Sequence, residues 1–235
     1  MIYITGDTHG EFGWLDQFCK ENTTGYDDIL IILGDAGINF SGGSRDEKLK
    51  DFLLRLPIIL FCIHGNHERR PQTLPGYQEV DWHGGKVYRQ IEYPNLLFAK
   101  DGEIFDFDGK KTVVLGGAYS IDKFYRIFNR LPWFEDEQPS PEIKAYAEQR
   151  LEEAGWQVDY VLSHTTPYRF EPREVFMPGV NQDLVDKTTE HWLDTIEERL
   201  QYKHWYAGHF HTNKWTEKLT LLFEEVEEFG KESEE

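Results

Sequence analysis

The chain opens on Met1-Ile-Tyr-Ile-Thr-Gly-Asp-Thr-His-Gly10, where a short apolar run passes directly into an aspartate and a histidine. The run Ile2–Thr5 predicts a buried strand, because β-branched and aromatic residues fit a packed sheet. The glycine after the run lets the backbone turn sharply. Residues i and i+2 of an extended chain point the same way, so Asp7 and His9 are placed to share one target.

The same pattern, an apolar run that ends in Asp, Asn or His, recurs four more times. The runs and the residues that follow them are Ile29–Leu33 with Gly34-Asp35, Ile58–Ile63 with Gly65-Asn66-His67-Glu68, Tyr160–Leu162 with Ser163-His164, and Trp205–Ala207 with Gly208-His209-Phe210-His211. Ligand sites of open α/β sheets form at the carboxyl ends of strands, so we expect the five ends to converge on one crevice. His209 and His211 share a direction. The adjacent Asn66 and His67 diverge, so one is free to hold an ion while the other faces a substrate.

Helical segments at Trp14–Lys20 and Asp46–Leu54 separate the first three strands. This alternation is the pattern of a parallel sheet with right-handed crossovers. Farther along, Asp108-Gly109 lies between two apolar runs, Glu103–Phe107 and Lys111–Leu115. An Asp-Gly pair in that position predicts a hairpin, so we expect part of the sheet structure to be antiparallel.

Two more helices are expected, at Pro141–Ala154 and Glu190–Leu200. In the second, Trp192, Ile196 and Leu200 follow each other at a spacing of four, which indicates a core-facing stripe. The chain is 39% hydrophobic and 15% aromatic over 235 residues, enough for a sizeable core. We expect a single α/β domain over residues 1–235.

The formal net charge of −18 argues against binding to long nucleic acid or to an anionic membrane. The excess is uneven: residues 216–235 hold eight acidic residues and two lysines, so we expect a solvated acidic end at about residues 224–235. Cys19 and Cys62 are too few for a disulfide scaffold or a thiolate zinc site. Neither a signal peptide nor an apolar stretch of about 18 residues is found, so we expect a cytoplasmic protein.

The side chains at the strand ends form a nitrogen and oxygen ligand set without cysteine. Such a set suits Mn, Fe, Zn, Ni or Co better than soft metals or calcium. Seven ligands are too many for one ion that must also bind water and substrate, so they predict two ions with a shared carboxylate, for which Asp35 is the natural bridge. Two divalent cations, Asp7, Asp35 and a bridging hydroxide leave about +1 facing the pocket, which attracts a phosphate ester.

Each motif has a plainer interpretation when it is taken alone. Asp and Gly are ordinary turn residues, and His164 by itself is more typical of a hydrogen-bonded core histidine. Together, however, five of the nine histidines lie at strand ends beside the required carboxylates, which favours a two-metal site. His83, His191 and His204 lack this context. Glu68 is expected to support its loop.

These residues resemble the calcineurin-like metallophosphoesterase superfamily, over blocks that span Gly6 to His211. The resemblance implies a four-layer αββα sandwich of two mixed β-sheets flanked by helices, with metals at the carboxyl ends of strands. It implies that one metal is held by Asp7, His9, Asp35 and His211. The other would be held by Asp35, Asn66, His164 and His209. His67 matches the family histidine that stabilises the transferring phosphoryl group and protonates the leaving oxygen.

The chain departs from the branch that contains the Ser/Thr protein phosphatases. That branch continues Gly-Asp into a Val-Asp-Arg-Gly-like run, whereas here Ala36-Gly37-Ile38-Asn39 follows. Neither the phosphate-binding arginine of that run nor the aspartate that partners His67 is in its expected place. An arginine commonly precedes Gly-Asn-His-Glu in the branch, and His64 stands there instead. The protein-phosphatase substrate therefore does not carry over.

A local basic patch is a candidate to bind phosphate in place of the missing arginine. Residues 119–134 include Lys123, Arg126 and Arg130 against a single acidic residue. Lys123 and Arg126 are candidate substrate-binding residues, as are Arg69, which follows the Gly-Asn-His-Glu block, and Arg169, which follows His164. The alternative is a solvated basic helix with exposed loop arginines.

The sequence therefore predicts a phosphoesterase with two divalent metal ions. A metal-bridging hydroxide would hydrolyse a small phosphate mono- or diester, with His67 as the catalytic residue. Manganese is the expected metal, and Fe, Zn, Ni, Co and Mg stay open. The alternatives are a nuclease acting on DNA or RNA through the same site, and a scaffold that keeps the fold without activity. The native substrate and the oligomeric state stay open as well.

Overall fold

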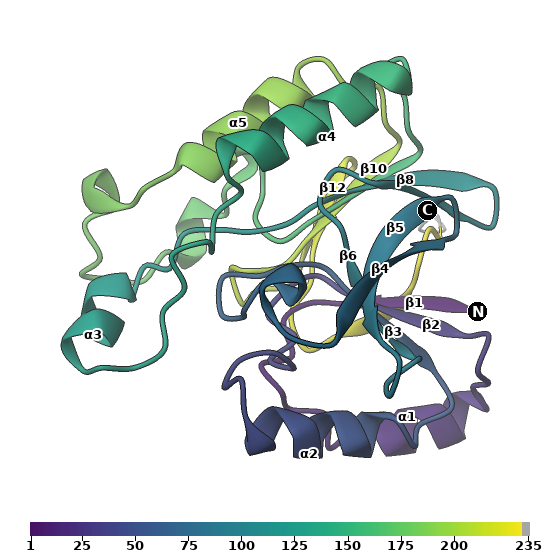
Figure 1. Cartoon of the computed structure of the whole chain (residues 1–235). Helices are drawn as coiled ribbons and strands as arrows, with labels where there is room; N and C mark the ends of the chain where they lie inside the picture. Colours follow the sequence, from purple (N-terminus) through teal and green to yellow (C-terminus); the bar gives the residue numbers. More distant parts are fainter. Residues whose placement is uncertain (232–235) are drawn as a thin grey trace.

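Two β-sheets pack face to face in this computed structural model, which describes residues 1–231. Helices cover both outer faces, so the order of layers is αββα (Figure 1). The predicted α/β sandwich of two mixed sheets is confirmed.

The first sheet has seven strands in the order β13-β1-β2-β3-β6-β5-β4. Its strands are β1 (Ile2–Thr5), β2 (Ile29–Ile32), β3 (Ile59–Cys62), β4 (Tyr77–Trp82), β5 (Gly85–Gln90), β6 (Leu96–Ala99) and β13 (Val226–Glu228). The neighbours among β1, β2, β3 and β6 are parallel, and the pairings toward both edges are antiparallel.

The second sheet has six strands in the order β11-β12-β10-β9-β8-β7. Its strands are β7 (Ile104–Phe107), β8 (Lys110–Leu115), β9 (Tyr160–Ser163), β10 (His204–Ala207), β11 (Lys214–Trp215) and β12 (Leu219–Leu221). The predicted hairpin at Asp108-Gly109 joins β7 to β8, and its register pairs Phe107 with Lys110.

Alternation along the central strands explains the layers. In β2, Ile29 and Ile31 belong to the core between the two sheets, whereas Leu30 and Ile32 pack in the cluster beneath the helices. In β9, Leu162 faces the inter-sheet core and Val161 faces the other helical layer. Strands that are buried on both faces need cover on both faces, and the helices provide it.

Four helices form the two outer layers. These are α1 (Leu15–Asn22) and α2 (Ser44–Leu53) over the first sheet, and α4 (Pro141–Glu153) and α5 (Thr188–Glu197) over the second (Figure 1). The start of α4 is set by Ser140, whose hydroxyl accepts a hydrogen bond from the backbone N–H of Ile143, and by a proline in the first turn. The predicted apolar stripe of the last helix is buried in the core.

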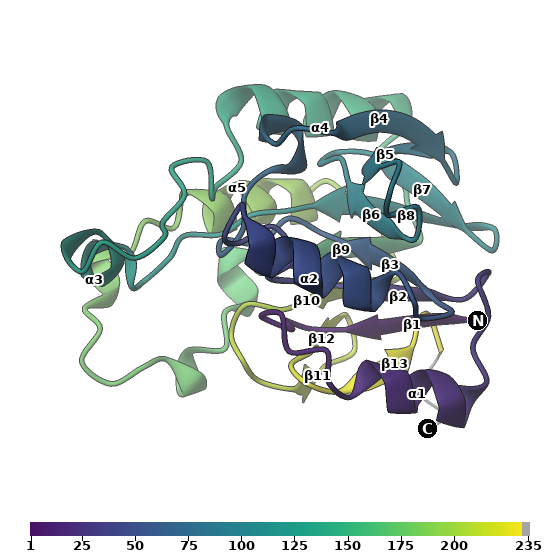
Figure 2. The same ribbon diagram turned by 60° about the horizontal axis from the view of Figure 1, so that its bottom comes forward.

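A fifth helix, α3 (Lys123–Phe128), stands apart from the sandwich (Figures 1 and 2). It buries none of its residues. Short 3-10 turns lie at Pro71–Thr73, Tyr168–Phe170, Arg173–Val175 and Gln182–Leu184. No helix of the described chain is both long and apolar enough to cross a membrane.

The expected acidic end is exposed to solvent at Glu224, Glu225 and Glu228, but over the residues that the structure describes it is not a free tail. Strand β12 is fully buried, and β13 pairs with β1 in the register Tyr3 with Glu228. Phe229 packs in the core between the sheets. The charge count missed this because two apolar residues among the glutamates, Val226 and Phe229, pack against the rest of the protein. Residues 232–235 of the expected end lie outside the described residues.

Candidate metal centre

The five strand ends singled out in the sequence meet at one edge of the sandwich. Strands β1, β2 and β3 are parallel to one another in the first sheet, as are β9 and β10 in the second, so within each sheet their carboxyl ends lie together. Five of the seven expected ligands line a single cavity of about 650 Å³: His9, Asp35, Asn66, His209 and His211. The other two, Asp7 and His164, are buried in the adjoining structure.

A first group of potential ligand atoms belongs to Asp7, His9 and His211, whose ligand atoms lie within 4.8 Å of one another. The Nε2 atoms of His9 and His211 are 3.0 Å apart. His211 Nε2 is 3.3 Å from Asp7 Oδ2. Two imidazole nitrogens and a carboxylate oxygen that converge in this way suit a first-row divalent cation.

A second group of potential ligand atoms belongs to Asp7, Asp35 and His164, again within 4.8 Å of one another. Asn66 Oδ1 lies 2.8 Å from His164 Nε2. Asp35 lies between the two groups: its Oδ1 is 3.7 Å from His164 Nε2 and its Oδ2 is 4.0 Å from His9 Nδ1. Asp7 is a member of both groups.

His209 completes the set from the side of the second sheet. Its ring packs against the ring of His164, with ring centroids 5.0 Å apart. Burial and the neighbouring His164 lower the pKa of His209 well below the ordinary value. A neutral imidazole is the form that binds a metal.

A metal fits these residues because one of their buried oxygens lacks a partner. Asp7 Oδ2 is buried and accepts no hydrogen bond from the described residues, which is costly for an ionised group. Burial alone would raise the pKa of Asp7, but its interactions with His211, His164 and the backbone N–H of His209 lower the pKa to about 2. The carboxylate is therefore ionised, as a metal ligand must be.

The backbone at the site is strained in a way that points to function. His9, Asp35, His209 and His211 all have positive φ values, from 48° to 68°. Residues with a Cβ rarely adopt this left-handed conformation, which costs of order 1 kcal/mol or more each. The strain aims side chains that follow directly from strands into the crevice.

Glycines allow the ligand side chains to pack against the backbone. A Cβ at Gly34 would lie 2.1 Å from His164 Nδ1, and a Cβ at Gly65 would lie 2.0 Å from Asp35 Oδ1. Both glycines directly precede an expected ligand in the sequence, so the Gly-Asp and Gly-Asn pairs serve this packing.

Two ligand side chains are oriented by residues that the sequence did not single out. The carbonyl of Leu33 lies 2.7 Å from His164 Nδ1, which leaves Nε2 facing the site. Asn66 Nδ2 donates to Ser120 Oγ at 2.9 Å, so the amide oxygen Oδ1 faces the site. Such outer contacts fix the direction of metal ligands. Ser120 follows the end of β8, so the rule that sites form at the carboxyl ends of strands could have identified it from the sequence.

Glu68 supports its loop, as expected. Its Oε1 accepts a hydrogen bond from the backbone N–H of Gly65 at 2.9 Å. Burial, with a smaller effect from the nearby Asp35, raises the pKa of Glu68 to about 8.

His67 is held over the cavity by its backbone. Its N–H donates to Asp35 Oδ1 at 2.7 Å, and its side chain lines the same cavity as the ligands. Burial lowers the pKa of His67, which Asp35 opposes and Arg126 reinforces. Within residues 1–231 no carboxylate is hydrogen-bonded to the ring, in line with the missing aspartate of the sequence pattern.

The structure brings only one of the four candidate substrate-binding residues, Arg126, into the cavity. Lys123 Nζ instead lies over the ring of Trp133, 4.2 Å from its centroid. Arg69 is exposed and its guanidinium lies 5.6 Å from the ring centroid of Phe134.

Arg169 is directed away from the site. Its guanidinium pairs with three carboxylates at the carboxyl end of α5 and just beyond it, Asp194, Glu197 and Glu198. The proximity of Arg169 to His164 in the sequence was misleading because a 3-10 turn, Tyr168–Phe170, carries the side chain to the outer helix.

Arg45 is a cationic residue that the sequence did not single out. It lies in the first turn of α2 and lines a second cleft of about 290 Å³ together with His9, His67 and Arg126. The cleft thus has two guanidinium groups beside the metal centre. The pair Gly42-Gly43 before Arg45 indicates a turn. An arginine that follows a turn is common, so nothing in the sequence was a reason to select Arg45.

Several solved structures are similar to this chain over most of its length. A Thermus thermophilus protein (TT1561) is 14% identical, with a TM-score of 0.48, over 94% of this chain and 87% of that chain. A phosphopantetheinyl hydrolase from Mycobacterium tuberculosis is 14% identical, with a TM-score of 0.37, over 94% of this chain and 87% of that chain. A comparison with curated proteins gave no match.

The family comparison agrees with the site. Residues 1–213 match the family model described as calcineurin-like phosphoesterase, and this range contains all of the expected ligands and His67. The chain belongs to the calcineurin-like phosphoesterase family, whose members hydrolyse phosphate esters with the help of metal ions.

Proposed function

We propose that the protein is a phosphoesterase with two divalent metal ions that acts on a small phosphate ester in the cytoplasm. Asp7, His9, Asp35 and His211 would hold one ion. Asp35, Asn66, His164 and His209 would hold the other. The observation that supports this most strongly is the position of Asp35, whose two oxygens face a histidine of each group.

Two ions held in this way would supply a nucleophile at neutral pH and positive charge for the phosphoryl oxygens. Manganese is the metal we expect, and Fe, Zn, Ni, Co and Mg are the alternatives. The ligand side chains are prepared for this role, since Asp7 is ionised and His209 is neutral.

His67 is the proposed catalytic residue. With its lowered pKa, the free imidazole is neutral near pH 7 and donates one N–H to a phosphoryl oxygen. An anionic ester bound beside the ring would raise that pKa, because a nearby negative charge favours the protonated form. The imidazolium then has a proton to give to the leaving oxygen.

Arg126 and Arg45 are the residues proposed to bind the non-reacting phosphate oxygens. Both line the cleft that also contains His67. They take the place of the arginine that the Ser/Thr phosphatase branch carries after Gly-Asp. Guanidinium groups bind phosphate oxygens in pairs, which orients the ester for in-line attack.

The size of the cavity and the charge of the chain favour a small substrate over a nucleic acid. A cavity of about 650 Å³ is within the usual range for small-molecule sites, about 300–1,000 Å³. The net charge of −18 opposes long polyanions, whose binding depends on many Lys and Arg contacts.

Reconstitution of the metal-stripped protein tests the proposal. We expect no hydrolysis of p-nitrophenyl phosphate or of bis-p-nitrophenyl phosphate by the stripped protein, and turnover of at least one ester after addition of Mn²⁺ or another ion of the set. Asp35→Asn should abolish this turnover, whereas Asp16→Asn, at an exposed aspartate of α1, should retain it. A protein that takes up the ions and hydrolyses no ester would be a scaffold, and the proposal would be wrong.

A further inference from the structure

The cavity over the metal centre has two unlike halves. One half contains the expected ligands and His67. The other half is built of aliphatic and aromatic side chains from three loops: Ile121, Val175, Phe176, Met177, Val180, Val185 and Phe210. None of these side chains has a role in binding metal or phosphate, so their presence at the site needs another explanation.

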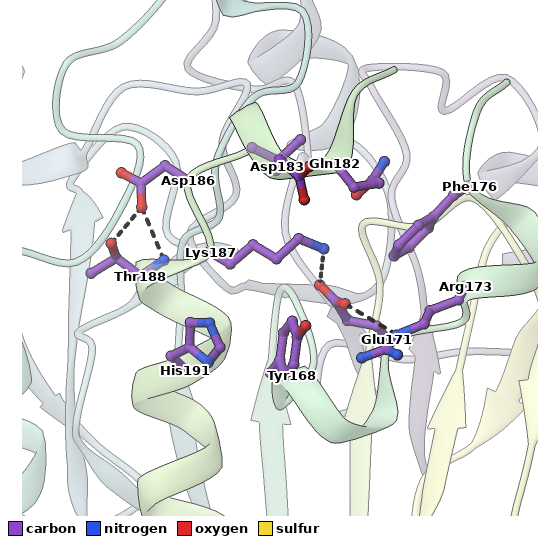
Figure 3. A pocket seen from close by; sticks show the side chains of 11 residues that line it. Tyr168, Glu171, Arg173, Phe176, Gln182, Asp183, Asp186, Lys187, Thr188 and His191 are labelled. Atoms are coloured by element: carbon purple, nitrogen blue, oxygen red, sulfur yellow. Dashed lines mark hydrogen bonds and ion pairs between the residues drawn. The ribbon is translucent and has the colours of Figure 1, made fainter. Parts of the chain in front are cut away.

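The polar residues of this half neutralise one another. Lys187 Nζ lies 2.6 Å from Glu171 Oε1 and 4.7 Å from the ring centroid of Phe176. Figure 3 shows this arrangement in an adjoining pocket, where Arg173 approaches the other oxygen of Glu171 at 3.9 Å. Lys187 and Glu171, the two members of this cluster that line the cavity over the metal centre, form a neutral pair.

Glu190 lies at the buried end of the same half. Its Oε1 accepts a hydrogen bond from Thr165 Oγ1 at 2.9 Å, and burial raises its pKa to about 7. A carboxyl group with this pKa is largely neutral at slightly acidic pH. At pH 7 a carboxyl group with a pKa of about 7 is about half protonated, so burial removes part of the charge of Glu190.

The mouth of the cavity is apolar as well. Ile121, Val175 and Met177 line the cavity and are at the same time exposed to solvent, Met177 to 61%. Helix α3 follows Ile121 and exposes Phe124 and Phe128, which no packing in the fold requires. Exposed apolar side chains that gather at one place on a surface mark a binding site.

We propose that one organic substituent of the phosphate ester is an extended apolar group, and that the apolar half of the cavity binds it. This inference rests on the proposed function, since it places the phosphoryl group at the metal centre. With the phosphate there, the substituent enters the apolar half and removes the exposed side chains at the mouth from water. The substrate is thus an amphiphile with a phosphate end and a hydrocarbon body.

An aliphatic group fits the lining better than a nucleobase does. Five of these seven side chains are aliphatic or thioether groups, and Tyr119 adds a third aromatic ring to the lining. A base would leave its hydrogen-bonding edge against the aliphatic groups. An unpaired polar edge in such a pocket is unfavourable, because its groups lose their hydrogen bonds to water and gain none from the protein. A hydrocarbon chain has no polar group that would be left unpaired there.

Two series of esters test the inference on the metal-loaded protein: n-alkyl phosphates from methyl to hexyl, and p-nitrophenyl n-alkyl phosphates over the same range. Turnover of either methyl ester tests the proposed function alone. In the series that is turned over, we expect kcat/KM to rise about two- to fourfold per methylene, because burial of a methylene contributes about 0.8 kcal/mol. The hexyl ester should exceed the methyl ester at least about thirtyfold.

Variants locate the effect in the cavity. Met177→Ser should lower the hexyl-to-methyl ratio of kcat/KM about fivefold or more. Leu184→Ser, at an exposed position of the same segment that does not line the cavity, should keep the ratio of the unchanged protein. Both side chains are largely exposed, so neither substitution endangers the fold.

A flat dependence on chain length, or equal ratios for the two variants, would overturn the inference while the methyl esters still report the phosphoesterase activity. A preference for nucleotide esters over the hexyl ester would overturn it as well, and would assign the cavity to a base. If no ester of either series is hydrolysed, the proposed function fails first, and the inference that rests on it falls too.

Discussion

Gly65→Ala is a sharp test of the site, because it changes a residue that binds nothing and displaces one that is expected to bind both ions. A methyl group at this position would lie 2.0 Å from Asp35 Oδ1 and 2.2 Å from the backbone nitrogen of Asp35. Comfortable contacts between nonbonded heavy atoms are about 3.5–4.0 Å. Asp35 or the loop of residue 65 must therefore move by more than about 1 Å.

The size of the effect follows from that displacement. A misplacement of about 1 Å in a catalytic site costs about 100-fold in rate, and forcing an extra methyl group into a packed region costs about 1–3 kcal/mol of stability. We expect Gly65→Ala to lower kcat/KM at least about 100-fold and to lower the number of tightly bound ions below two. Hydrolysis of a p-nitrophenyl ester and elemental analysis of the dialysed protein measure the two quantities.

Gly13→Ala is the matched control. A Cβ at Gly13 would have no atom within 4 Å, so that variant should keep both the ions and the activity. If Gly65→Ala retains two ions per chain and full turnover, the close approach of Asp35 to this backbone does not matter for function, and the assignment of Asp35 as the shared ligand loses its basis.

Three further predictions concern residues around the metals. His67→Ala should keep both ions and lose about 10²–10⁴-fold in kcat, the usual contribution of a positioned acid or base; unaltered turnover would remove its catalytic role. Arg126→Gln should raise KM about tenfold, as loss of one charged hydrogen bond does, whereas Lys123→Gln, at a side chain held over Trp133, should change KM less than about twofold. Burial raises the pKa of Glu190 from 4.5 to about 7, so the native state keeps a proton that the unfolded state releases, and stability falls as pH rises from about 4.5 to 7. The free energy of unfolding of Glu190→Gln, measured in urea, should therefore increase relative to that of the unchanged protein by up to about 3 kcal/mol between pH 5 and pH 8.5. A difference in stability that does not depend on pH would contradict a buried carboxyl group with a raised pKa.

The ligands were predictable from sequence because chemistry and topology coincide in them. Asp7, Asn66 and His164 each follow a strand that is buried on both faces, and such strands appear as continuous apolar runs. The carboxyl ends of parallel strands meet at one edge of each sheet. That these residues lie close together could therefore be predicted without knowing the side-chain geometry.

The strands toward the edges were harder to predict. In β4 the side chains of Gln78, Glu79 and Asp81 are exposed, so the segment has no continuous apolar run. Strand β13 has the composition of an acidic tail, and its pairing with β1 joins the two ends of the described chain. Long-range pairing of this kind leaves no local pattern.

The walls of the cavity could not be predicted for a different reason. Val175, Met177 and Val180 lie among short turns without regular periodicity, and their apolar side chains stay partly in water. Arg45 reaches the metal centre only because α2 begins beside the loop after β2. Arg169 shows the opposite error, since three carboxylates of the helical layer outweigh its closeness to His164 in the sequence.

The central claim is that two metal ions share Asp35, and electron paramagnetic resonance of the manganese-loaded protein tests it most directly. We predict two Mn²⁺ per chain by elemental analysis, with the spectrum of an exchange-coupled pair, and loss of that coupling in Asp35→Asn. One ion per chain, or two ions whose spectra stay those of isolated Mn²⁺, would contradict the claim.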